Sequence, residues 1–255
     1  KPDRYIKNLK KTVEKILAKK ISKNDLEKTW GFLNTDYFRR HSDEEIAWHI
    51  EIIVKNTPNN AVSIRESEIK GCSELTIFQN HRKNIFSYIA NIIDNLNINI
   101  VDARIITLKN NQALDTYLLL DSEGKFIKDK YTLKFLKEKI SDVLVNSNHK
   151  INKITKKQTE NIASFKNFVN IDITRKSTDI LLEVSTLDHP GLLSKICESL
   201  DSCDLMVKDA KISTLGEEAN DIFVLVPANK KDFLDNDMSN IKDIIKDKIS
   251  ELYIN

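Results

Sequence analysis

The segment with the clearest chemical character is Leu187–Leu193, where an acid, a proline and a glycine precede an apolar helical pattern. Pro190 suits the start of a helix, because the backbone N–H that proline lacks would be unpaired there anyway. Gly191 allows a tight turn and the close approach of a ligand. The free N–H groups of the first helical turn, at the positive end of the helix dipole, suit a carboxylate. Asp188 could accept a hydrogen bond from an ammonium, so the segment predicts a site for a free α-amino acid.

Two roles for Asp188 stay open at this point. Its carboxylate could bind the ammonium of a ligand, or it could cap the helix without any ligand. The predicted site comprises the acid and the five residues that follow it: Asp188, His189, Pro190, Gly191, Leu192 and Leu193.

The chain contains an internal repeat. Residues 85–96 and 192–203 carry the same apolar helical stripe at a constant spacing of 107 residues. The match continues beyond the helix through two alternating segments, as far as Tyr117 in the first copy and Phe223 in the second. A duplicated unit is therefore predicted.

Each copy is predicted to contain a strand, the matched helix, two further strands and a second helix. This order is typical of a ferredoxin-like βαββαβ unit, in which two helices cover one face of an antiparallel sheet. Residues 168–173 are expected to supply the fourth strand of the first copy. The second copy ends soon after its last helix, so its fourth strand is expected to be absent or to come from elsewhere. The predicted fold class is α+β.

A small helical segment precedes the two copies. Ser22 and Ser42 each stand three residues before an acid, which is the pattern of a helix N-cap. A segment of about 60 residues buries little core unless it packs on a neighbour. We expect a helical segment at residues 1–58, a first repeat at 60–176 and a second repeat at 177–255, with a basic, mobile connection at 146–166.

The composition excludes several functional classes. The five glycines are spread along 255 residues, whereas a phosphate-binding loop needs them clustered. Three cysteines without a CxxC pair argue against a zinc site or a disulfide framework and predict a reducing, cytoplasmic location. The 40 Lys and Arg residues are interspersed with 38 acids, and no apolar run approaches a membrane helix. Neither a nucleic acid nor a membrane is expected as a partner, and no catalytic residue is assigned.

The Asp188–Leu193 pattern within a βαββαβ unit resembles the ACT domain, a regulatory module that binds amino acids. Two further matches are more specific. Asn99–Ile105 together with Ala113–Tyr117 resembles the first ACT domain of the bacterial PII uridylyltransferase/uridylyl-removing enzymes. Tyr37–His49 resembles the segment that precedes the ACT pair in those enzymes, so the resemblance covers nearly the whole chain.

The resemblance implies a regulatory function. Enzymes of this family sense glutamine, and they add UMP to the signalling protein PII or remove it. The chain is then expected to be the glutamine-sensing part, with its ACT domains paired within or between chains and the catalytic domains upstream. The whole enzyme is expected to need Mg²⁺, and this chain no cofactor. Two alternatives stay open: an ACT module of a different enzyme, and a free-standing enzyme.

The first copy departs from the pattern at the corresponding turn. It lacks the acid, the proline and the glycine, although Arg82 and Lys83 could still favour an anion there. Asn84 tolerates a left-handed backbone better than most residues do. A second, weaker site is therefore predicted from His81, Arg82, Lys83, Asn84 and Asn99.

His41 and His49 lie eight residues apart with three acids between them. This composition would suit a metal site. However, Ser42 as a helix cap places His41 outside the helix that carries His49. The two histidines are therefore expected not to converge, and to serve in packing or capping.

Overall fold

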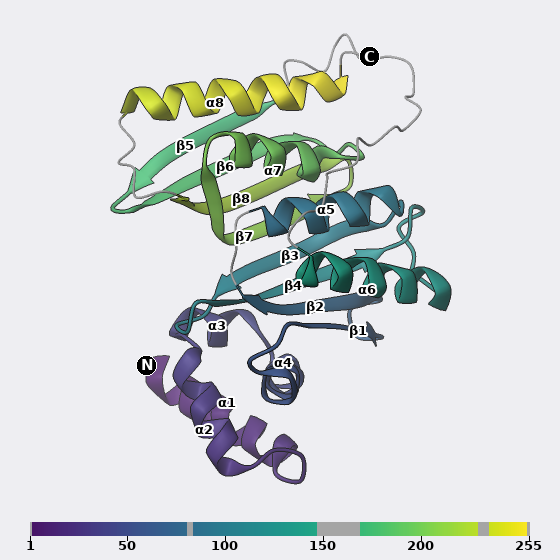
Figure 1. Ribbon diagram of the computed structural model, residues 1–255, viewed down its shortest axis with the longest axis vertical. Coiled ribbons are helices and arrows are strands. Elements are labelled where there is room, and N and C mark those ends of the chain that lie inside the picture. The colour runs from purple at the N-terminus through teal and green to yellow at the C-terminus, as the bar shows by residue number, and fades with distance from the viewer. Residues whose placement is uncertain (1, 81–83, 147–168, 229–234, 254–255) are drawn as a thin grey trace. The chain divides into compact units, whose positions relative to one another are not determined.

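The computed structural model describes residues 2–80, 84–146, 169–228 and 235–253. Its eight strands form a sheet in the order β1-β2-β4-β3-β7-β8-β6-β5 (Figure 1). The chain divides into two compact units. One comprises residues 1–63, 76–81 and 106–115, and the other comprises residues 64–75, 82–105 and 116–255.

The two repeats have the same order of elements, namely two strands, a helix, two strands and a helix. The first repeat contains β1 (Ala61–Ser67), β2 (Cys72–Asn80), α5 (Ile85–Asn95), β3 (Asn99–Thr107), β4 (Gln112–Leu120) and α6 (Lys130–Val145). The second contains β5 (Asn170–Lys176), β6 (Asp179–Leu187), α7 (Leu192–Ser202), β7 (Leu205–Leu215), β8 (Glu218–Pro227), α8 (Asp235–Ser250) and the 3₁₀ turn η2 (Glu251–Tyr253). The predicted α+β fold with two ferredoxin-like repeats is confirmed.

The position of the fourth strand differs from the prediction. β5 pairs antiparallel with β6, so that Asn170 lies opposite Ser185 and Lys176 lies opposite Asp179. Of the predicted strand 168–173, residues 170–173 belong to β5 and do not pair with the first repeat, so that prediction is wrong; residue 168 lies outside the described residues. β5 supplies the fourth strand of the second repeat, which was expected to be absent or to come from elsewhere, and the second of these alternatives is confirmed. In the first repeat, the corresponding edge beside β2 is occupied by β1, which the sequence analysis missed.

A short connection explains why β5 pairs with β6. Only residues 177–178 separate the two strands, and Ser177 has a positive φ of 59°, as tight hairpin turns require. Consecutive strands joined by a tight turn usually pair with each other. The order within each repeat is therefore ββαββα, with the edge strand in front of the common βαββα part.

The first compact unit contains four helices. They are α1 (Pro2–Leu17), α2 (Lys23–Phe32), α3 (Thr35–Arg40) and α4 (Asp43–Asn56). At the start of α2, Ser22 accepts a hydrogen bond from the N–H of Asp25. At the start of α4, Ser42 and Glu45 form a complete capping box. Both predicted helix starts are confirmed.

These helices share a core with the strand ends that belong to the same unit. Phe78 of β2, Ile106 of β3 and Leu114 of β4 are buried together with the apolar faces of the helices. The backbone N–H of Lys109 donates to the carbonyl of Phe32 at 3.1 Å. The helical segment thus buries its apolar side chains by packing on neighbouring strands, as its small size predicts.

In the second unit, α7 and α8 lie over the same face of strands β5 to β8 (Figure 1). β6 is central and pairs with both β5 and β8, while β8 also pairs with β7. The buried stripe of α7 comprises Leu192, Ile196 and Leu200, at the spacing of one helix face. On its other side, α7 contacts α5 of the first repeat.

Part of what the sequence predicts falls outside the described residues. This applies to His81, Arg82 and Lys83, and to the connection at 146–166 except Asn146. Within the described ranges, no helix has the length and apolar character needed to cross a membrane.

Candidate functional site

The predicted ligand turn, Asp188–Gly191, joins β6 to α7. Gly191 occupies the N-cap position with φ 87° and ψ 0°, a left-handed conformation that glycine adopts without strain. The backbone N–H of Asp188 donates to the carbonyl of Glu217 at 2.7 Å, which ties the turn to the β7–β8 hairpin. The expected tight turn before the helix is confirmed.

The first turn of α7 presents two backbone donors. The N–H of Leu192 donates to the carbonyl of His189 at 2.9 Å, and the regular helical ladder begins only at Lys195. The N–H groups of Leu193 and Ser194, which lie between these two residues, have no backbone acceptor among the described residues. These two groups point out of the positive end of the helix dipole, where an anion is favoured.

The side chains of the turn divide into two groups. Leu192 and Leu193 are buried in the core, so they can offer only backbone atoms to a ligand. Pro190 is exposed, and its carbonyl accepts a hydrogen bond from Nδ1 of His189 at 2.7 Å. This bond holds the imidazole of His189 over the turn.

Asp188 does not cap the helix, because no side chain forms a capping hydrogen bond at the start of α7. Asp188 is exposed, yet partial loss of hydration raises the pKa of its carboxyl. A hydrogen bond from the N–H of His189 and the nearby imidazole oppose this rise in pKa. A ligand ammonium would oppose it as well, since an opposite charge favours the ionised carboxylate.

A second acid, Asp221, lies close enough to interact electrostatically with Asp188 of the turn. It lies on β8 opposite Val184 of β6 and is 2% exposed. Its carboxylate accepts a hydrogen bond from the N–H of Ser213 at 3.2 Å. Burial, with the charge of Asp188 as a smaller contribution, raises the pKa of Asp221 to about 7. In the sequence, Asp221 falls within the repeated stretch that ends at Phe223.

Tyr253, in η2, contacts both Leu187 and His189 of the turn segment. Its hydroxyl donates to the carbonyl of Leu187 at 2.6 Å and lies 3.3 Å from Oγ1 of Thr186. Its ring meets the ring of His189 edge-on, with the centroids 5.5 Å apart. Sequence reasoning missed Tyr253 because it lies far along the chain. Its one signal is an aromatic residue directly after the last amphipathic helix.

The first repeat has the equivalent helix start but not the equivalent acid. Asn84 is the N-cap of α5 with φ 66° and ψ 1°, the same left-handed conformation as Gly191. Asn99 lies at the start of β3, where its side-chain amide donates to the carbonyl of Asp121 at 2.9 Å. Asn84 and Asn99 stand before and after α5, a helix about 16 Å long. The structure therefore does not bring these two predicted residues together.

Each repeat also carries a buried acid at the same place in its last strand. Asp115 of β4 corresponds to Asp221 of β8 and has no exposed surface. Nε2 of Gln79 donates to Oδ2 of Asp115 at 2.7 Å. Burial raises the pKa of Asp115 to about 7.

The histidine pair of the helical segment converges, contrary to the prediction. The ring centroids of His41 and His49 are 5.0 Å apart, and both side chains are buried. Tyr37 joins them: its hydroxyl bonds Nδ1 of His49 at 2.9 Å, and its carbonyl lies 3.0 Å from Nδ1 of His41. His41 is the C-cap of α3, and His49 lies on α4, the next helix along the chain. Among the described residues, no group of three or more His, Cys, Asp or Glu side chains could hold a metal ion.

Comparison with known proteins matches the chain to a family model and to curated relatives. Residues 2–52 match the family model described as "Uridylyltransferase GlnD fifth domain". The chain is 32% identical over 237 residues to the bifunctional uridylyltransferase/uridylyl-removing enzyme of Pseudomonas aeruginosa (strain LESB58). It is 30% identical over 236 residues to the enzyme of that name from Pseudomonas fluorescens (strain SBW25).

Each of these two matches covers 89% of this chain and 26% of the relative, so the chain spans about a quarter of the length of its relatives. The backbone is also similar to aspartate kinase from Synechocystis, with a TM-score of 0.41 and 15% identity, over 72% of this chain and 27% of that chain. By sequence, the chain corresponds to the C-terminal part of the bifunctional uridylyltransferase/uridylyl-removing enzymes.

Proposed function

We propose that this chain is the glutamine-sensing part of a cytoplasmic bifunctional uridylyltransferase/uridylyl-removing enzyme. It binds a free amino acid at the Asp188–Leu193 turn. The bound state controls uridylylation and deuridylylation of PII by domains outside this chain, and those domains would use Mg²⁺. The observation that carries the proposal is the left-handed Gly191, directly followed by a helical turn with two unpaired N–H groups and flanked by Asp188.

Two opposite charges of the ligand would be recognised separately. Its carboxylate would accept hydrogen bonds from the N–H groups of Leu193 and Ser194, assisted by the helix dipole. Its ammonium would donate to Asp188, and the buried Asp221, whose pKa is raised to about 7, would add negative charge nearby only above about that pH. Hydrogen bonds to charged groups are worth roughly 1.5–3 kcal/mol each. The preference for glutamine comes from the relationship to the family.

The two repeats would bind the amino acid unequally. The first repeat shares the left-handed helix start at Asn84 but has no acid at the position of Asp188. We therefore propose a strong site in the second repeat and a weaker one at the turn that includes His81, Arg82 and Lys83. Pairing of the repeats within this chain is supported by the contact between α5 and α7.

Calorimetry with L-glutamine and L-glutamate tests this proposal on the 255-residue chain. Asp188→Ala should weaken glutamine binding about ten- to a hundredfold, because it removes the partner of the ammonium. Gly191→Val should weaken binding at least as much, since a branched residue is strained at a φ of 87°. His81→Ala is the matched control in the first repeat and should have a smaller effect. If His81→Ala abolished binding while Asp188→Ala left it intact, the sensor would be the first repeat.

A further inference from the structure

The contacting helices α5 and α7 carry the same pattern of small and acidic residues. A serine in the first turn is followed by a small residue three positions later and by an aspartate seven positions later. The residues are Ser87, Ala90 and Asp94 in α5, and Ser194, Cys197 and Asp201 in α7. The two serines and the two small residues are at most 2% exposed, which lets the helices approach closely. The charges of Asp94 and Asp201 both reach Cys197, where they add to the effect of burial in raising the pKa of its thiol.

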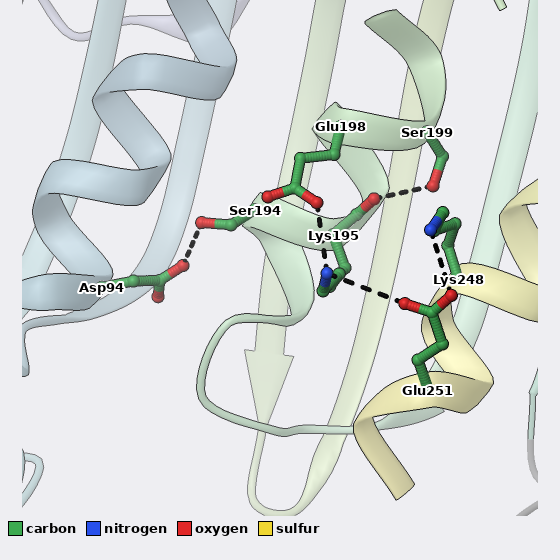
Figure 2. Close-up of polar contacts among 7 residues, drawn as sticks. All are labelled: Asp94, Ser194, Lys195, Glu198, Ser199, Lys248 and Glu251. Atoms are coloured by element: carbon green, nitrogen blue, oxygen red, sulfur yellow. Dashed lines mark hydrogen bonds and ion pairs between the residues drawn. The ribbon is translucent and has the colours of Figure 1, made fainter. Parts of the chain in front are cut away.

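Only one of the two equivalent serines reaches the opposite helix. Oγ of Ser194 donates to Oδ2 of Asp94 at 2.5 Å, across the contact between the repeats (Figure 2). Ser87 is its counterpart at the start of α5. The hydroxyl of Ser87 is buried and has no hydrogen-bond partner in the structure.

Ser194 also behaves differently from the other serines of its helix. A serine within a helix commonly donates to a carbonyl of the preceding turn. Ser199 donates to the carbonyl of Lys195 at 2.7 Å, and Ser202 donates to the carbonyl of Ser199 at 2.7 Å. Ser194 instead donates to a carboxylate of the other repeat, a bond that is stronger because one partner is charged.

The hydrogen bond from Ser194 to Asp94 lies at the candidate site. The N–H of Ser194 is one of the two unpaired donors of the first turn of α7. The next residue, Lys195, pairs with Glu198 at 3.2 Å and with Glu251 at 3.8 Å (Figure 2). Glu251 begins η2, which also carries Tyr253. The first turn of α7 is therefore held from α5 on one side and from the C-terminal turn on the other.

We propose that Asp94 of the first repeat is a positioning residue for the amino-acid site of the second repeat. It fixes Ser194, and with it the N–H groups of Leu193 and Ser194, in the orientation that receives the ligand carboxylate. Asp94 acts through Ser194 and does not itself touch the ligand. This inference rests on the proposed function, because it assigns a role to Asp94 in binding at that same turn.

The test is calorimetry with L-glutamine on variants of the 255-residue chain. Ser194→Ala and Asp94→Ala should each weaken binding about tenfold, as expected for the loss of one charged hydrogen bond. The double variant should bind no more weakly than either single variant, since both remove the same bond. Asp94→Asn keeps an acceptor oxygen and should stay within about threefold of the unchanged chain. Ser87→Ala is the matched control, and it should bind as the unchanged chain does because its hydroxyl makes no bond.

Additive effects of Ser194→Ala and Asp94→Ala, or normal affinity in both, would overturn the role of Asp94 while leaving the proposed function standing. If the unchanged chain bound neither glutamine nor glutamate, the proposed function would fall instead. Amide hydrogen exchange without ligand then decides the positioning role. The N–H groups of Leu192 and Lys195 should exchange faster in Ser194→Ala than in Ser87→Ala, and equal rates would overturn it.

Discussion

The substitution Asp221→Asn should change how the stability of the chain depends on pH. Asp221 is 2% exposed, and burial raises its pKa from 3.8 to about 7. In the unfolded chain, an aspartate ionises near its ordinary pKa of about 3.9. Between these two pH values, the folded state keeps a proton that the unfolded state has released. The free energy of unfolding therefore falls as the pH rises through this window.

The size of the effect follows from the pKa difference. A difference of about 3 units corresponds to about 4 kcal/mol, at about 1.36 kcal/mol per unit. This loss of unfolding free energy is absent below about pH 4 and complete above about pH 7. Asparagine never ionises, and its side-chain oxygen can still accept the hydrogen bond from the N–H of Ser213. The advantage of Asp221→Asn over the unchanged chain should therefore grow by about 4 kcal/mol between pH 4 and pH 8.

Urea unfolding at pH 4, 6 and 8 measures this difference directly. The control is Asp243→Asn, which changes an exposed aspartate of α8 and removes the same formal charge. Its unfolding free energy should run parallel to that of the unchanged chain at all three pH values. If Asp221→Asn also ran parallel to the unchanged chain, Asp221 would not be a buried acid with a raised pKa, and the reasoning would be refuted.

Three further results are expected. Asp115→Asn should show the same sign of pH dependence in urea unfolding, because burial raises the pKa of Asp115 to about 7 as well; a flat difference between pH 4 and pH 8 would contradict this. Tyr253→Phe removes the hydrogen bond to the carbonyl of Leu187 and should lower the free energy of unfolding by about 1 kcal/mol, measured by urea at neutral pH; an unchanged value would mean that the bond contributes nothing. The chain incubated with UTP, Mg²⁺ and PII should yield no uridylylated PII by mass spectrometry, and a modified product would show a catalytic site within these 255 residues.

Local signals in the sequence predicted the parts of this protein that depend on neighbouring residues. The caps at Ser22 and Ser42 start helices, because a side-chain oxygen within three residues satisfies the N–H groups of the first turn. The left-handed positions at Gly191 and Asn84 follow from the conformational freedom of those two residue types. The repeat indicated the α+β fold, because each copy shows an apolar helical stripe followed by two alternating, strand-like segments. β1 has such a local signal too, since Val62 and Ile64 alternate with polar residues.

The tertiary structure decided what depends on partners far apart in the chain. An edge strand can be supplied from either end of a repeat, and only the formed hairpin shows that β5 pairs with β6. The hydrogen bond from Tyr253 to the carbonyl of Leu187, and that from Ser194 to Asp94, join positions whose spacing in the sequence carries no periodic signal. The raised pKa of Asp221 likewise arises from burial between strands, because desolvation depends on everything packed around a group and not on its neighbours in sequence.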